Sequence, residues 1–258
     1  MQSIFSKAEE LKNEQKRAAL CIVVETKGST PRKQGAKMIV FSDGTIYGTI
    51  GGGSIEKEAA EKAVDMIAAG KPAKLSFQLE EDLGMHCGGY VEVYIEPLNP
   101  NQKIYIFGAG HIGKALAGFA RELDFAVTLF DPREGIFNDP VFSRYTCINQ
   151  DYFKAIDEAV FDDFTYIVIV TPKHTFDEEI LARVARKTHA YLGMIGSIRK
   201  VELLQERFLR EKILTKEEMA TIDMPIGLKF LVESPQEIAV SIAAKLIDVR
   251  NNLNKSNY

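Results

Sequence analysis

Three glycines follow a short apolar run at a spacing that suits the binding of a phosphate group. Residues 104–107 (IYIF) are apolar and partly β-branched, and Gly108, Gly110 and Gly113 come directly after them. In this G-x-G-x-x-G arrangement, the first glycine permits a tight turn and the second lets the backbone approach a pyrophosphate without a Cβ in the way. The third glycine lets the following helix pack close to the strand. The N–H groups and partial positive charge of that helix N-terminus would then bind the anion.

The residues after the glycines complete this pattern. His111 and Ile112 open a segment whose apolar residues recur every three or four positions, which predicts a helix. A second apolar run, residues 126–130, ends in Asp131, which would accept hydrogen bonds from ribose hydroxyls and favours an NAD-like ligand. Arg133 weakens the preference for an unphosphorylated ribose, because a nearby arginine can accommodate a 2′-phosphate. Strand, glycine turn, helix, strand and acid together predict a Rossmann fold.

A second glycine-rich junction is a candidate anion site in the first half of the chain. Gly51, Gly52 and Gly53 precede a predicted helix with Ser54 as a candidate N-cap, and a nearby basic loop carries Arg32. Glycine-rich turns before a helix can bind an anion through their N–H groups. The same residues are also expected where a tight turn needs only glycine dihedral angles. The sequence leaves both interpretations open.

Polar residues also follow two later apolar runs. Thr171 and His174 come directly after residues 166–170, and Gly196 and Ser197 open a predicted helix with basic residues in its first turn. The carboxyl ends of the strands in a doubly wound sheet line the ligand crevice, so we expect the loop of Thr171 and His174 to face the same crevice as the glycine turn. The alternative is that polar residues of this loop only cap the next helix.

Cys87 is the one cysteine predicted to lie in a loop, where His86 and two glycines flank it. A thiolate in such a loop could act as a nucleophile or as a ligand for a soft metal. The two other cysteines, Cys21 and Cys147, are distant in the sequence and fall in apolar runs, so we expect them to be buried. This spacing argues against a structural zinc site.

The elements that position these residues fall into two predicted domains. Residues 1–99 combine two helical patterns with short strands, one pair of which is joined across an Asp-Gly turn at Asp43, and predict an α+β domain. Residues 100–258 alternate strands and helices and predict a Rossmann-like, doubly wound parallel sheet. The expected fold class is therefore α/β, with a smaller N-terminal α+β domain.

Composition excludes several classes of function. The 258 residues carry a net charge of -4, with 12 basic and 14 acidic residues up to Pro100 and 20 basic and 22 acidic residues after it. Neither half is basic, so nucleic acid is not an expected partner. No apolar run is long enough to span a membrane, and no signal-peptide core precedes the first domain. Three widely spaced cysteines favour a reducing cytoplasm, and a homodimer is expected only as the commonest assembly of such chains.

Eight motifs occur in a fixed order along the chain. They are GSTPR, GGGSIE, CGGYVEVYIEP, FGAGHIG, DPR, TPKHTFD, YLGMIGSIRK and PIGL, between about residues 18 and 246. With these motifs the chain resembles the XdhC/CoxI family, which are accessory proteins for molybdenum hydroxylases such as xanthine dehydrogenase. The resemblance implies a small N-terminal domain followed by a Rossmann domain.

The resemblance also implies a function. Such a protein would bind molybdenum cofactor (molybdopterin), support its sulfuration and hand it to the apo-enzyme of a molybdenum hydroxylase, with a cysteine desulfurase as a further candidate partner. It would be a maturation chaperone and not itself an enzyme. Family members commonly have a cysteine where this chain has Ser54, which leaves Cys87 as the candidate for a contact with molybdenum or sulfur. The basic and histidine positions of the family's loop are kept at Lys173 and His174.

Two other classes of function stay open at this stage. The glycine turn and Asp131 also suit an NAD(P)-dependent oxidoreductase whose N-terminal domain forms the substrate pocket. His111 and His174 would be its candidate proton donors, although His111 lies inside the glycine motif itself. A ligand-sensing or interaction module without chemistry is the third alternative, because a fold does not determine a function.

Overall fold

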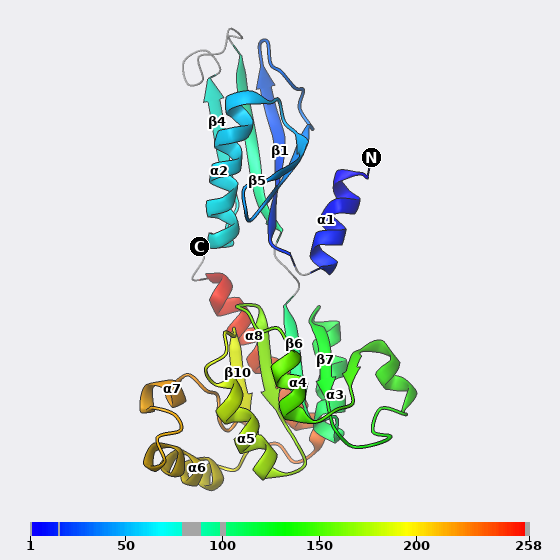
Figure 1. Ribbon diagram of the computed structural model, residues 1–258, viewed down its shortest axis with the longest axis vertical. Coiled ribbons are helices and arrows are strands. Elements are labelled where there is room, and N and C mark those ends of the chain that lie inside the picture. The colour runs from blue at the N-terminus through cyan, green and yellow to red at the C-terminus, as the bar shows by residue number, and fades with distance from the viewer. Residues whose placement is uncertain (1, 15, 79–88, 99–101, 256–258) are drawn as a thin grey trace. The chain divides into compact units, whose positions relative to one another are not determined.

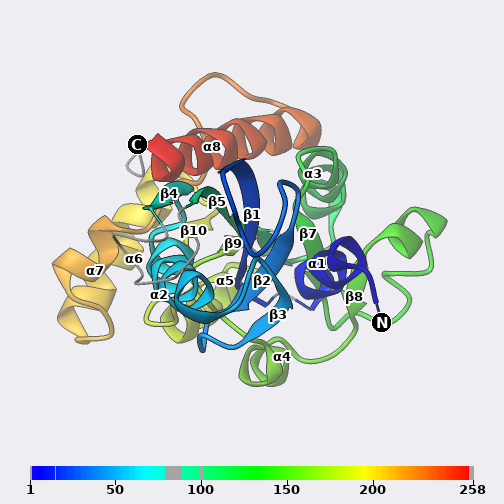
Figure 2. The ribbon, with the colours of Figure 1, turned by 90° about the horizontal axis from the view of Figure 1, so that it is seen from above.

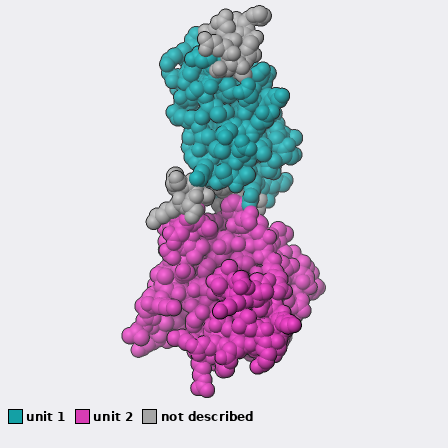
Figure 3. Space-filling model, turned by 90° about the vertical axis from the view of Figure 1, so that its left-hand side faces the viewer, with its two compact units in different colours: residues 1–101, 254–258 teal, residues 102–253 magenta. Residues whose placement is uncertain are grey.

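The computed structural model describes residues 2–14, 16–78, 89–98 and 102–255. The chain divides into two compact units, one formed by residues 1–101 with 254–258 and the other by residues 102–253 (Figure 3). Each unit has its own sheet and its own hydrophobic core. Of the helices that the structure describes, none is both long enough and apolar enough to cross a membrane.

The N-terminal unit is an antiparallel sheet with one helix on each face. Its strand order is β3-β2-β1-β5-β4 (Figure 1). The elements are α1 (Ile4–Asn13), β1 (Ala18–Lys27), β2 (Lys37–Phe41), β3 (Ile46–Thr49), α2 (Gly53–Ala69), β4 (Ala73–Gln78) and β5 (Tyr90–Leu98). Because β1 is apolar at successive positions, it can bury both faces. Cys21 belongs to the core that includes residues of α2, and Leu20 to the core that includes residues of α1.

The predicted hairpin at Asp43 is confirmed. β2 and β3 pair in antiparallel register from Lys37 with Thr49 to Val40 with Ile46. The carboxylate of Asp43 accepts a hydrogen bond from the N–H of Thr45 at 2.9 Å, which fixes the turn between the strands.

The C-terminal unit is a five-stranded parallel sheet with the order β10-β9-β6-β7-β8. Its elements are β6 (Lys103–Phe107), α3 (His111–Glu122), β7 (Ala126–Phe130), η1 (Pro140–Arg144), β8 (Thr146–Ile148), α4 (Tyr152–Glu158), β9 (Thr165–Ile169), α5 (His174–Val184), β10 (Tyr191–Met194), α6 (Ile198–Arg210), α7 (Lys216–Ala220) and α8 (Pro235–Lys255). Strand β7 pairs with one edge of β6, and β8 follows beyond β7. Strand β9 pairs with the opposite edge of β6. This order confirms the predicted Rossmann-like α/β fold, and its topological switch point lies between β6 and β9.

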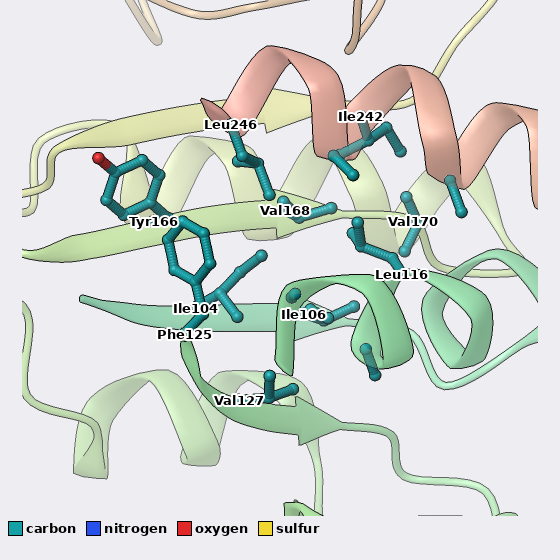
Figure 4. Packing of buried hydrophobic residues seen from close by; sticks show 14 of the residues in the cluster. Ile104, Ile106, Leu116, Phe125, Val127, Tyr166, Val168, Val170, Ile242 and Leu246 are labelled. Carbon is teal, nitrogen blue, oxygen red and sulfur yellow. The ribbon is translucent and has the colours of Figure 1, made fainter. Parts of the chain in front are cut away.

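The strand at the switch point is buried on both faces. Ile104 and Ile106 point into the core that α3 and α8 cover, where Leu116 and Ile242 pack beside them (Figure 4). Phe107 points to the opposite face, into the core formed with α4, α5 and α6. Figure 2 shows α3 and α8 on one side of this sheet and α4 and α5 on the other. This packing explains why β6 is apolar at every position that follows Lys103.

Two short helices have no counterpart among the elements expected from the sequence. Asp151 begins α4 by accepting hydrogen bonds from the N–H groups of Phe153 and Lys154. Thr215 begins α7 through a capping box with Glu218. Helix α4 has 7 residues and α7 has 5, so neither is long enough for a helical repeat of apolar residues to be recognised in the sequence.

Candidate functional site

The first and third glycines of the motif are required by the backbone of the turn. Gly108 has a φ of 111°, and a Cβ at this position would lie 2.4 Å from the carbonyl oxygen of Val170 and 2.9 Å from Cα of Thr171. A Cβ on Gly113 would lie 1.9 Å from the carbonyl oxygen of Gly108. These contacts bring the glycine turn and the loop after β9 together at the switch point, as the sequence analysis predicted for that loop.

The middle glycine faces open space. Gly110 has an ordinary extended conformation, with a φ of -70°, and is the N-cap of α3 without a side-chain capping bond. Beyond the two neighbouring residues, the nearest atom to a Cβ built there is Nη2 of Arg133, at 3.9 Å. His111, Ile112 and Gly113 form the first turn of α3, so their N–H groups have no intrahelical partner. The position over Gly110 can therefore receive an anion without steric conflict.

Asp131 is fully buried, and its carboxylate is saturated with donors. Oδ1 accepts from the backbone N–H (3.1 Å) and Nε (2.9 Å) of Arg133, and Oδ2 accepts from the N–H of Ala109 (2.8 Å) and from Nη2 of Arg133 (2.7 Å). Burial alone would raise the pKa of Asp131, but these hydrogen bonds outweigh it and hold the pKa below its ordinary value. The ribose contact predicted for Asp131 would require Arg133 to release it.

Asn149, directly after β8, bonds to the backbone of the same segment. Its Nδ2 donates to the carbonyl oxygens of Asp131 (2.7 Å) and Arg133 (2.9 Å). The backbone on both sides of the pair is thereby fixed at the carboxyl end of β7.

Replacing Asp131 by asparagine is expected to change the acid sensitivity of the protein. Because the folded-state pKa of Asp131 is lowered, its contribution to stability is present above the unfolded pKa and is lost as the pH falls through the folded pKa. Asp131→Asn should cost about 2 kcal/mol at pH 7, and this difference from the wild type should shrink as the pH falls below about 4, the ordinary pKa of an aspartate. Urea unfolding at several pH values measures it. A difference that stays constant with pH would contradict the assignment.

A second polar cluster lies at the carboxyl end of β9. Asp177 is buried and its Oδ1 accepts from the N–H (2.9 Å) and the hydroxyl (2.7 Å) of Thr171. Its Oδ2 lies 3.3 Å from Nδ1 of His174, and Nε2 of the same ring lies 2.6 Å from Nζ of Lys200. An ammonium can only donate, so this contact assigns the ring proton to Nδ1, on the side of Asp177. Burial raises the pKa of Asp177, and the bonds from Thr171 only partly offset it.

This cluster borders a cavity of about 300 Å³ between α5 and α6. Gly196 lines the cavity together with His174, Asp177 and Lys200. Ser197, by contrast, caps α6 by accepting from the N–H of Lys200. Asp177 does not cap α5, because its carboxylate accepts hydrogen bonds from Thr171 and the N-cap of the helix, Lys173, makes no side-chain capping bond.

The triple glycine of the N-terminal unit surrounds a carboxylate of the chain itself. Oε1 of Glu56 accepts from the N–H groups of Ile50 (3.0 Å), Gly51 (3.2 Å) and Gly52 (2.8 Å), and also from the hydroxyl of Thr49. Burial works against the ionised form, but these bonds prevail and lower the pKa of Glu56. Helix α2 begins at Gly53, so the expectation that Ser54 is its N-cap is wrong.

Three motifs of this unit meet at one end of its sheet. A Cβ on Gly51 would lie 3.3 Å from Cβ of Pro31, and a Cβ on Gly89 would lie 2.2 Å from the carbonyl oxygen of Ser29. Arg32 and Ser54 are exposed there. Cys87, two residues before Gly89 in the sequence, lies outside the described residues. The two described cysteines are not activated thiols: burial raises the pKa of Cys21 to about 12 and also raises that of Cys147.

Tyr152 is a residue of the C-terminal site that the sequence analysis did not identify. Its ring packs between Phe107 and Phe176, and its hydroxyl is buried without a hydrogen-bond partner among the residues that the structure describes. Burial raises the pKa of Tyr152, and the charges of Asp131, Arg133 and Asp177 lie close enough to affect it. Position 152 falls in the short helix α4, which left no periodic signal in the sequence.

Comparison with known proteins identifies relatives of this chain. An uncharacterized protein of Escherichia coli (YqeB) is 32% identical over 256 residues, which cover 97% of this chain and 47% of the relative. The molybdenum cofactor insertion chaperone PaoD of E. coli is 23% identical, with 91% of this chain and 84% of the relative covered. A probable xanthine dehydrogenase subunit of Bacillus subtilis is 24% identical over 65% of this chain and 49% of the relative. This chain therefore spans about half the length of two of these relatives.

A solved structure and two family models agree with the fold. The crystal structure of a xanthine dehydrogenase from Bacillus halodurans has a TM-score of 0.53 and 20% identity, covering 97% of this chain and 96% of that one, which shows a shared fold. Residues 11–78 match the model of the XdhC and CoxI family, and residues 104–246, more than half of the chain, match that of the XdhC Rossmann domain. The protein is therefore a member of the XdhC/CoxI family.

Proposed function

We propose that this protein is a maturation factor that binds molybdenum cofactor as cargo and delivers it to a molybdenum hydroxylase. The names of the relatives support the proposal: one is a molybdenum cofactor insertion chaperone and another is a probable component of xanthine dehydrogenase. The structural observation that carries it is the open position over Gly110, where the N-terminus of α3 meets the guanidinium of Arg133. Molybdenum cofactor ends in a phosphate or a pyrophosphate, and this position suits such a group.

The residues of the C-terminal unit fit the polar end of the cargo. The first-turn N–H groups of α3, from His111 to Gly113, would hold the phosphate, with Arg133 beside them. Thr171 and His174 lie at the end of the neighbouring strand, and Gly196 and Ser197 lie at the start of α6. We propose these four residues as the border of the same site, where the pterin would extend beyond the phosphate.

The residues of the N-terminal unit suit the cargo less directly. The N–H groups of Gly51 and Gly52 already donate to Glu56, so only Gly53, Ser54 and the basic Arg32 remain for a contact. A hydroxyl at Ser54 is a harder ligand than the family's usual thiol and does not suit molybdenum held by sulfur. We therefore propose Cys87 as the thiol that contacts molybdenum or its sulfur.

Metal and pterin analysis tests this function. We expect protein purified from cells that make molybdenum cofactor to contain molybdenum and fluorescent oxidised pterin. Cys87→Ser should retain the pterin and lose most of the molybdenum or its sulfur, and Cys147→Ser is the matched control that should change neither. Protein with no pterin above a control protein purified from the same cells would contradict the proposed function.

Delivery has its own test. A wild type loaded with cofactor should activate a molybdenum hydroxylase apo-enzyme, and a cysteine desulfurase should increase that activation if sulfuration occurs on the carrier. The oxidoreductase alternative gains no support from the site, because the acceptor positions of Asp131 that would read a ribose are taken by Arg133 and Ala109. The test is the absorbance of a nicotinamide nucleotide in the presence of the protein and a broad panel of substrates. A substrate-dependent change in that absorbance would support the oxidoreductase alternative.

A further inference from the structure

Asp131 has no acceptor position left for a ligand. An ionised carboxylate offers about four lone-pair positions. Four donors, three from Arg133 and one from Ala109, occupy them at 2.7 to 3.1 Å, and the residue is 0% exposed. In a dinucleotide site, the acidic residue at this position accepts hydrogen bonds from the ribose hydroxyls. Here the carboxylate of Asp131 accepts only from donors of the protein itself.

Arg133 is directed outward by the same bonds. Its Nε and Nη2 face Asp131, which leaves Nη1 and the second hydrogen of Nη2 available, and its side chain is 43% exposed. Nη2 also lies 3.9 Å from the Cβ position of Gly110. Nη2 of the guanidinium therefore contacts the buried carboxylate and also borders the open position over the N-terminus of α3.

The arrangement is fixed before any ligand binds. Asn149 holds the backbone of both partners, and the bidentate pair fixes the plane of the guanidinium. A donor that is already held in place loses little conformational entropy on binding, so its contact with an anion is stronger than that of a free surface arginine.

An unsatisfied polar group lies on a ring that packs against Phe107, the residue directly before the glycine turn. The hydroxyl of Tyr152, 1% exposed, has no partner among the described residues, although buried hydroxyls are nearly always hydrogen-bonded. Charges on Asp131, Arg133 and Asp177 reach it. A water molecule could supply the missing partner.

We propose that Arg133 is the anion-recognising side chain of this site and that Asp131 is its positioning residue. This inference rests on the proposed function and narrows its ligand class. The ligand presents a phosphomonoester or a pyrophosphate over Gly110, and it is not recognised through a ribose diol. Both the phosphate-terminated and the nucleotide forms of a pterin cofactor carry such a group.

Calorimetric titration with inorganic pyrophosphate and with adenosine tests this ligand class on the full chain. The wild type should bind pyrophosphate and show no heat with adenosine. Arg133→Gln should weaken pyrophosphate binding at least tenfold, while Arg144→Gln, which removes an exposed arginine of the same unit, should leave it within twofold. Binding of adenosine by the wild type, or equal binding of pyrophosphate by wild type and Arg133→Gln, would overturn the inference.

The positioning role of Asp131 is tested by a double-mutant cycle. Asp131→Asn should weaken pyrophosphate binding several-fold when Arg133 is present and should have no further effect in the Arg133→Gln protein. Circular dichroism confirms that each variant is folded under the titration conditions. An equal loss in both backgrounds would show a merely structural role and would overturn the assignment.

The outcome for pyrophosphate also separates this inference from the proposed function. Loss of pyrophosphate binding in Arg133→Gln supports the inference even if no molybdopterin co-purifies with the wild type. The absence of molybdopterin would contradict only the proposed function. Equal molybdopterin content in wild type and Arg133→Gln would defeat the inference and leave the function standing.

Discussion

Gly113→Ala is expected to destabilise the C-terminal unit by about 3 kcal/mol or more, because its Cβ would overlap backbone that cannot move independently. The methyl group would lie 1.9 Å from the carbonyl oxygen of Gly108, which is itself held in a left-handed conformation against Val170. Any shift that relieves one contact tightens another. Urea unfolding followed by circular dichroism measures the loss.

Gly110→Ala is the matched control in the same turn. Its backbone conformation suits alanine and no atom beyond the two neighbouring residues lies closer than 3.9 Å to the added Cβ, so the cost should be below about 1 kcal/mol. The methyl group would, however, stand where we place the phosphate. We expect the variant to fold and to lose pyrophosphate binding at least tenfold. Equal destabilisation by the two substitutions would contradict the different roles that the structure gives these glycines.

Glu56→Ala is expected to destabilise the N-terminal unit by about 3 kcal/mol, because it leaves three backbone N–H groups and one hydroxyl without their acceptor. The lowered pKa of Glu56 adds a pH dependence: the stabilisation is present above the unfolded pKa and is lost as the pH falls through the folded one. Thermal unfolding at pH 7 and at pH 4 should therefore show a smaller difference between wild type and variant at the lower pH.

Glu58→Ala is the control for this prediction. Glu58 lies on the same helix and is exposed, so its removal should leave the stability of the unit unchanged. If Glu56→Ala proved as neutral as Glu58→Ala, the carboxylate would not be the acceptor that organises the triple-glycine turn.

The sequence was sufficient to predict the fold because the strong signals were local. Four successive apolar residues predicted β6, and the glycine spacing predicted both the turn and the helix that follows it. The convergence of Thr171 with this turn followed from a general rule of parallel sheets. Elements with little periodicity, such as α4, could not be predicted in the same way.

The site itself depended on contacts that sequence spacing does not specify. Asp131 and Arg133 are two residues apart. This spacing is equally compatible with a site in which Asp131 binds a ribose and with one in which Arg133 binds a phosphate. Only the structure shows that the carboxylate is buried against Ala109 and holds the guanidinium outward. The triple glycine was ambiguous for a similar reason, because the anion that its N–H groups bind is supplied by Glu56 from within the chain.

The most direct test of the account is the molybdopterin content of the wild type and of Gly110→Ala, purified from the same cofactor-producing cells. We expect fluorescent oxidised pterin in the wild type and at least a tenfold lower amount in Gly110→Ala, with both proteins folded under the purification conditions. Equal pterin in both would show that the cofactor does not bind at the glycine turn. Absence of pterin from the wild type would contradict the carrier function itself.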